Sequence, residues 1–113
     1  MIMTRRKERK IGVLGTEYTF RFATKKEDPE LEKLNGYCVT AGSKLIVVED
    51  VPGSDDVSGV RKRTSRHEII HAFLFESGLD NEAPWADCEE QLVDWLAIQF
   101  PKLVKAMEEA EAL

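Results

Sequence analysis

Arg66-His67-Glu68-Ile69-Ile70-His71 is the segment that contains both histidines of this 113-residue chain. On an α-helix, residues four apart lie one turn above each other, so the imidazoles of His67 and His71 can converge on one point. Two neutral imidazoles at one point suit a zinc ion. Glu68 is rotated by about 100° from His67, where it can reach a water bound to that ion rather than the ion itself. The pattern predicts a zinc-binding helix with Glu68 as general base, and the alternative is an amphipathic core helix that happens to carry two histidines.

The length and composition of the chain predict one soluble domain over residues 1–113. Hydrophobic residues make up 42% and charged residues 33%, which is ordinary for a folded protein and argues against wholesale disorder. A chain of this size can form one core but not a second lobe for binding a substrate. Any active site is therefore expected to be a shallow cleft.

The formal net charge of -5 does not favour nonspecific binding to nucleic acid. The N-terminus is basic, but the segment that follows it is too short and polar for a signal peptide, and no apolar run approaches the length of a membrane span. We therefore expect a cytoplasmic protein without a membrane partner. Its two cysteines, Cys38 and Cys88, are expected to be reduced.

Residues 10–50 are expected to form the strand-rich half of the domain, after a flexible lead-in over residues 1–9. Runs of β-branched and aromatic residues predict strands at residues 10–14, 16–22, 37–40 and 44–49. Alternation places Tyr18, Phe20 and Phe22 on one face, which should pack against the helices. Asp28-Pro29 predicts the start of a short helix. The apolar residues 44–48 form a candidate sheet edge with which a substrate backbone could pair.

Residues 58–111 are expected to form the helical half, with helices at 58–78, from 84 or 85 to 99, and at 101–111. Gly78 suits the C-cap of the first helix, whose apolar second half should be enclosed by other elements. Phe100-Pro101 should end the second helix. The residues expected to be buried on the second and third helices are Trp85, Cys88, Leu92, Trp95, Leu96, Gln99, Leu103, Val104 and Met107. The predicted fold class is α+β, with a small, mostly antiparallel sheet packed on about three helices.

Zinc held by two histidines needs at least one more protein ligand. The candidates that follow His71 are Asp80, Glu82, Asp87, Cys88, Glu89 and Glu90. Glu90 and Asp94 stand four apart on one helix face, so Glu90 could bind the ion while Asp94 accepts the free ring N–H of a ligand histidine. The alternative is that this acidic face is only solvated.

The combination of His67-Glu68-Ile69-Ile70-His71 with Glu89-Glu90-Gln91-Leu92-Val93-Asp94 resembles the gluzincin branch of zinc metallopeptidases. More specifically, the chain is similar to minimal gluzincin-like and ImmA/IrrE-type proteins of phages and other mobile elements. The resemblance covers residues 58–100 and implies a minimal zincin-like domain. It implies that His67, His71 and Glu90 bind zinc, that Glu68 is the base and that Asp94 supports His67. Glu89 and Val93 depart from the polar neighbours of larger gluzincins.

The expected activity is zinc-dependent hydrolysis of a peptide bond in a specific protein or peptide substrate. A donor for the developing oxyanion is needed as well, and Tyr37 and Tyr18 are the available phenols, with Arg63 or Arg66 as alternatives. The chain has no second lobe that could define subsites. Either the substrate is a flexible protein segment, or a protein partner completes the cleft.

Two other functions fit the same sequence. In the first, zinc is structural or vestigial, and the protein is a non-catalytic interaction or regulatory module of a phage or mobile element. In the second, the chain is a metal-free regulatory protein whose basic run, residues 61–66, contacts nucleic acid.

Overall fold

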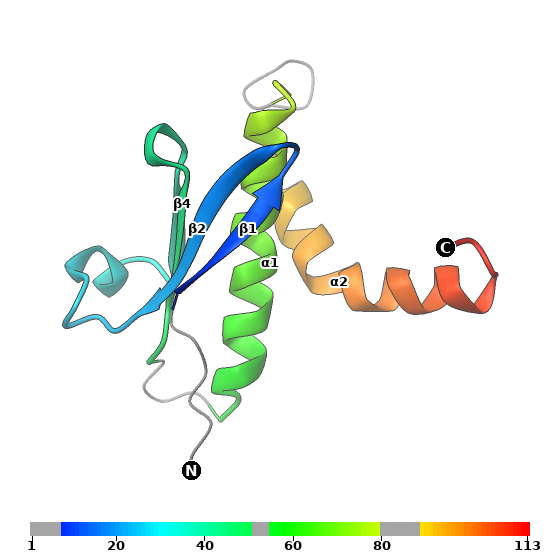
Figure 1. The fold of residues 1–113 in the computed structure, drawn as a ribbon. Coiled ribbons are helices and arrows are strands. Elements are labelled where there is room, and N and C mark those ends of the chain that lie inside the picture. The colour runs from blue at the N-terminus through cyan, green and yellow to red at the C-terminus, as the bar shows by residue number, and fades with distance from the viewer. Residues whose placement is uncertain (1–7, 51–54, 80–88) are drawn as a thin grey trace, which may run out of the picture.

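The computed structural model describes residues 8–50, 55–79 and 89–113. The fold is α+β: α1 lies against a four-stranded sheet, and α2 packs on α1 (Figure 1). In chain order the elements are β1 (Glu8–Val13), β2 (Thr16–Ala23), the 3-10 helix η1 (Pro29–Glu32), β3 (Gly36–Val39), the 3-10 helix η2 (Thr40–Gly42), β4 (Lys44–Val48), α1 (Val57–Glu76) and α2 (Glu89–Glu109). β1 begins at Glu8, within the predicted lead-in over residues 1–9, and residues 1–7 lie outside the described part.

The sheet is mixed, with the strand order β1-β2-β4-β3. The pairs β1/β2 and β3/β4 are antiparallel, as expected for a mostly antiparallel sheet, while β2 and β4 run parallel. Residues 44–48 are therefore not a sheet edge, and that prediction is wrong. Every residue of β4 after Lys44 is buried, which suits an internal strand covered on both faces. The edges are β1 and β3.

Each face of the sheet has its own apolar cluster. The face towards α1 holds Tyr18 and Phe20 together with Ala72 of the helix, and Phe22 packs against them. This confirms the face predicted from the alternation in β2. The other face is covered by Leu31 of η1, which packs with Ile46 and Val48. The Asp28 side chain caps η1, so the short helix expected there forms as one 3-10 turn.

The ends of α1 follow local capping rules. Asp56 accepts a hydrogen bond from the Gly59 N–H at 2.9 Å and caps the start of the helix. At its end Gly78 adopts φ +80°, and its N–H donates to the Phe75 carbonyl at 3.1 Å. The predicted C-cap is thereby confirmed.

The second half of α1 is less enclosed than expected. Phe73 and Phe75 are each 40% exposed, and Glu68 and Ala72 are the helix residues classed as buried. The sheet covers one side of the helix and α2 another, which leaves part of its apolar surface uncovered by described residues.

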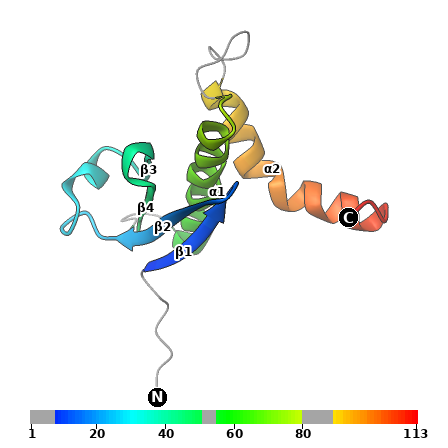
Figure 2. The ribbon, with the colours of Figure 1, turned by 45° about the horizontal axis from the view of Figure 1, so that its top comes forward.

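Two helices are found among the described residues instead of about three, because α2 continues through Pro101. Proline lacks the N–H that would bond to the carbonyl four residues earlier, which is that of Ala97. The Arg66 Nε–H of α1 donates to this carbonyl at 2.6 Å and replaces the missing partner. The helix bends along its length, and its C-terminal part points away from the sheet (Figures 1 and 2).

The buried side of α2 also differs from the predicted stripe. Leu92 and Trp95 are 41% and 52% exposed, whereas Val93 and Ala97 are buried. Of the residues expected to be buried further along, Met107 is exposed, and Leu103 and Val104 are half-buried. Trp85 and Cys88 lie outside the described residues. The helix packs through the face next to Glu90 and Asp94 rather than through its most apolar side.

In the described ranges, neither helix is both long enough and apolar enough to cross a membrane.

Replacing Arg66 by Met removes the donor to the buried Ala97 carbonyl. The free energy of unfolding should fall by about 1–3 kcal/mol, the usual effect of leaving a buried polar group without a partner. In a Pro101→Ala background the loss should be much smaller, because the alanine N–H can bond to that carbonyl instead. Urea unfolding of the unchanged chain, the two single variants and the double variant gives the coupling energy between positions 66 and 101. All four chains are measured at the same protein concentration. An equal loss in both backgrounds would contradict this role of Arg66.

Candidate metal centre

The three predicted zinc ligands, His67, His71 and Glu90, come together where the first turns of α2 pack on α1. The Nε2 atoms of His67 and His71 lie 3.2 Å apart, and Glu90 Oε2 lies 3.5 Å from His67 Nε2. Glu90 Oε1 contacts His71 Nε2 directly. One ligand atom from each residue lies within 4.8 Å of the other two. Two imidazole nitrogens and a carboxylate oxygen are a donor set that zinc takes in proteins, so this group could hold a metal ion.

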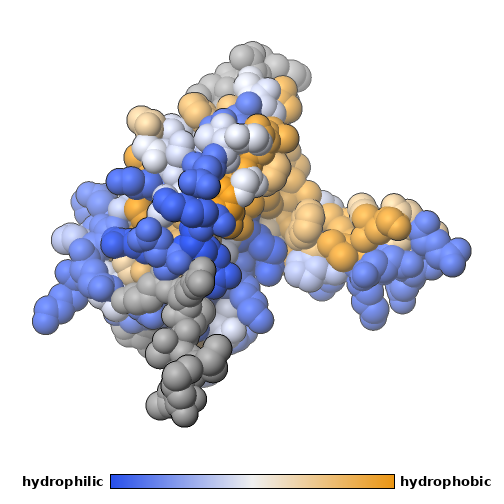
Figure 3. Space-filling view, viewed as in Figure 1, coloured by the Kyte–Doolittle hydropathy of each residue, from blue (hydrophilic) through white to orange (hydrophobic). Residues whose placement is uncertain are grey.

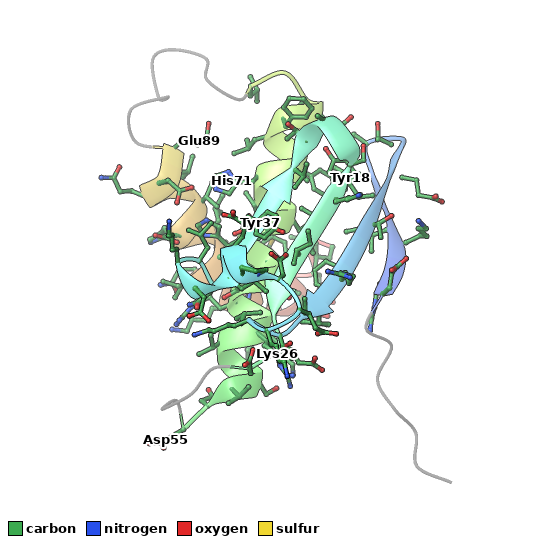
Figure 4. The ribbon with its side chains drawn as sticks, turned by 90° about the vertical axis from the view of Figure 1, so that its left-hand side faces the viewer. Tyr18, Lys26, Tyr37, Asp55, His71 and Glu89 are labelled. Atoms are coloured by element: carbon green, nitrogen blue, oxygen red, sulfur yellow. The ribbon has the colours of Figure 1, made fainter. Side chains whose placement is uncertain are left out.

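Carboxylates also stand behind both histidine rings. Asp94 Oδ1 lies 2.8 Å from His67 Nδ1, and Glu89 Oε2 lies 3.4 Å from His71 Nδ1. Figure 4 shows His71 on α1 facing the first turn of α2, where Glu89 lies. A carboxylate at Nδ1 fixes the ring and leaves Nε2 as the atom that can bind a metal. Both rings are therefore oriented for the same point.

Sequence reasoning anticipated the partner of His67 but not that of His71. The two helices place Asp94 opposite His67 and Glu89 opposite His71. The two histidines are four residues apart on α1, and their two partners are five residues apart on α2. Glu89, directly before Glu90, was the available signal: from the sequence it is a candidate zinc ligand and a departure from the family pattern, but not a partner of His71.

Glu68 is buried beside the three potential ligands, with 7% of its surface exposed. Burial raises the pKa of its carboxyl from the ordinary 4.5 to about 7, with the neighbouring His67 lowering it and Glu90 raising it further. A carboxyl with a pKa near neutrality can both accept and release a proton at neutral pH.

A cavity of about 560 Å³ opens over this group of residues. One wall is the edge strand β3 with the residues next to it, and the opposite wall is made by α1 and the start of α2. Besides the residues already described, its lining includes Asn35, Thr40, Arg63 and Thr64. The backbone of an edge strand thus forms one side of the cavity and lies close to Glu68 at Gly36.

Neither predicted phenol offers its hydroxyl to this cavity. The Tyr18 hydroxyl donates to Glu76 Oε2 at 2.7 Å, and the residue does not line the cavity. Tyr37 lines the cavity, but its hydroxyl donates to Asp28, and burial together with this bond raises the pKa of Tyr37 to about 12. Burial and the bond to Glu76 also raise the pKa of Tyr18.

The two arginines considered as alternative donors lie on different sides of α1. Arg63 lines the cavity, whereas Arg66 is bonded to the Ala97 carbonyl on the other flank of the helix. Of the four donors considered from the sequence, Arg63 is the one placed to reach a bound ligand. The earlier ligand candidates Asp80, Glu82, Asp87 and Cys88 lie outside the described residues.

Comparisons of the chain with protein-family models, curated proteins and solved structures found no match. The similarity of residues 58–100 to gluzincins therefore stays a prediction. What supports the candidate metal centre is its geometry and the chemistry of its donor atoms.

Gly36 allows β3 to lie close to α1 beside Glu68. A Cβ at this position would lie 2.8 Å from Thr64 Cγ2, 3.0 Å from the Ile46 carbonyl oxygen and 3.3 Å from Glu68 Cγ. Gly36→Ala should therefore push the edge strand away from the helix and lower the free energy of unfolding by about 1–3 kcal/mol.

Gly12→Ala is the matched control, because Gly12 also lies in an edge strand and a Cβ there meets nothing within 4 Å. Thermal or urea unfolding of both variants measures the difference. If the two substitutions changed stability equally, the close approach at Gly36 would not constrain the structure.

Proposed function

We propose that the chain is a zinc-dependent metallopeptidase that hydrolyses a peptide bond in a specific protein substrate. The observation that carries the proposal is the convergence of His67 Nε2, His71 Nε2 and a Glu90 carboxylate oxygen beside the buried Glu68. Carboxylates behind both imidazoles favour a metal ligand role, because a carboxylate that accepts the Nδ1–H leaves Nε2 unprotonated and able to bind an ion. His67, His71 and Glu90 would hold the ion.

A zinc ion held there would supply a Lewis acid that makes a bound water acidic and polarises a carbonyl group. Glu68 would take the proton from the attacking water and pass it to the leaving amine. Its position beside the three ligands suits both steps, since the same group must be a base first and an acid afterwards.

The edge strand β3 supports a peptide as the substrate class. The outer side of an edge strand carries backbone groups that an extended peptide can pair with. A peptide bound along β3 would run through the cavity that contains the candidate metal centre. Arg63, on the opposite wall, could donate to the oxygen that becomes negative during attack.

A second candidate is a protein that binds zinc without catalysis and acts by binding another protein. The observation that favours it is that the hydroxyls of Tyr18 and Tyr37 are both bonded to carboxylates away from the cavity. The two functions share the metal ligands and differ in whether Glu68 is needed. Activity measurements on a Glu68 variant therefore separate them.

Purified protein should contain about one zinc per chain, as expected for a site with this donor set, and His71→Ala should lose it. Asp94→Ala and Glu89→Ala should each weaken zinc binding by about 10–100-fold, the usual effect of losing a partner of a ligand histidine. Glu90→Ala should weaken it more than either. Competition with a chromophoric chelator measures the affinities.

Glu109→Ala serves as the control, because it removes the same kind of carboxylate from the far end of α2 and should leave zinc affinity unchanged. Equal affinities for the Glu90 and Glu109 variants would refute the ligand assignment. Absence of zinc uptake by the unchanged chain would refute the metal centre itself.

Glu68→Gln should retain zinc but lose peptidase activity by roughly 100-fold or more, the range that general acid–base groups contribute. The zinc-loaded chain and its variant are compared on a fluorogenic peptide library and on labelled denatured protein. Cleavage that survives in the Glu68→Gln variant would show that another group acts as base. Zinc binding without cleavage by either chain would favour the non-catalytic candidate.

A further inference from the structure

A second groove lies on the flank of α1 opposite the candidate metal centre. We call it the basic groove: a cavity of about 420 Å³ between α1 and the first two strands, lined by Arg9, Arg61, Lys62 and Arg66. Its floor is apolar and includes Phe22, with the Arg61 guanidinium 5.8 Å from the ring centroid. No aspartate or glutamate is among its lining residues. In a chain of net charge -5, this is a local concentration of positive charge around apolar surface.

The C-terminal arm, which we define as residues 101–113, has the opposite character. It projects from the rest of the domain, and apolar residues line one side of it (Figure 3). Leu103, Val104 and Met107 lie on that side by the helical repeat, and Met107 is 43% exposed. The radius of gyration of the chain, 15.2 Å, exceeds the roughly 13 Å expected for a compact domain of this length, consistent with a projecting element.

The charges of the arm complement those of the basic groove. Glu108 borders the apolar side, and Glu111 follows at the end of the helix, while Lys102 and Lys105 lie on the opposite side. The C-terminal end of a helix also carries a partial negative charge. No ion pair among the described residues involves Glu108 or Glu111. An amphipathic helix with an acidic end is the kind of ligand that an apolar groove with a basic rim accommodates.

The positions of the two features favour exchange between copies. Arg66 lines the groove and bonds to Ala97, which lies four residues before the arm, so the arm begins close to the groove. In a reciprocal twofold dimer, each arm would lie in the groove of the other copy. The helical part of the arm is only about 13 Å long, so one docked arm would bury less surface than a stable dimer needs. Reciprocal docking doubles the buried area.

We propose that the occupant of the basic groove is the C-terminal arm of a second copy of this chain, in a reciprocal twofold dimer. The apolar side chains of the arm cover the groove floor, and Glu108 and Glu111 meet the cations of the rim. The interface lies on the flank of α1 away from His67 and His71, so it is independent of the proposed activity. Such exchange of an identical element is a known route to dimers.

The test measures molar mass by light scattering and the dissociation constant by analytical ultracentrifugation. The unchanged chain should form a species of twice 12.8 kDa whose stability falls with salt. Arg9→Glu with Lys62→Glu in the groove, or Glu108→Lys with Glu111→Lys in the arm, should each raise the dissociation constant by roughly tenfold or more. These positions are exposed, so folding should be unaffected, as circular dichroism can verify.

Mixing the groove variant with the arm variant should restore dimers, because one acidic arm then meets the unchanged cations of a basic groove. The basic arm meets a groove in which two of the four cations are replaced by carboxylates. Lys26→Glu with Lys33→Glu is the control, since it makes the same change in net charge at exposed positions outside the groove. A monomeric unchanged chain at all concentrations would overturn the proposal. So would variants that dimerise like the unchanged chain, or a mixture that stays monomeric.

Discussion

The packing of the first turns of α2 against α1 is the contact on which the candidate site depends. Val93 and Ala97 are buried in it, and they lie one turn apart on the same face of α2. Glu90 and Asp94 lie one turn apart as well, beside that buried face, and so they meet the two histidines. A rotation of α2 that buried its most apolar side instead would carry both carboxylates away from α1. Helix packing thus creates the convergence of donors.

The same contact explains how the helix tolerates Pro101. The proline leaves the Ala97 carbonyl without its helical partner, and Ala97 is buried against α1. Arg66 satisfies that carbonyl from the neighbouring helix, directly before His67 in the sequence. A buried carbonyl without a partner is costly, so this bond favours one depth and rotation of α2 on α1. It thereby helps to hold Glu90 and Asp94 opposite the histidine rings.

The helix α1 presents different chemistry on its two flanks. One flank carries imidazoles, the buried carboxyl of Glu68 and Arg63, facing the edge strand β3. The other carries Arg61, Lys62 and Arg66 over an apolar floor. The basic run that suggests a nucleic-acid contact is therefore divided between two surfaces.

Local patterns determined much of this protein from the sequence alone. The four-residue spacing of His67 and His71, the alternation in β2 and the C-cap at Gly78 depend on residues close together in the chain, and regular helix and strand geometry makes them readable. The strand order, the continuity of α2 through Pro101, its buried face and the pairing of His71 with Glu89 were decided by the tertiary structure. Each of these features depends on a partner from a distant part of the chain. A strand edge needs a neighbouring strand, the Ala97 carbonyl needs a donor, and the His71 ring nitrogen needs a carboxylate. Sequence spacing cannot specify such a partner, because it is set by the packing of elements that are far apart in the chain.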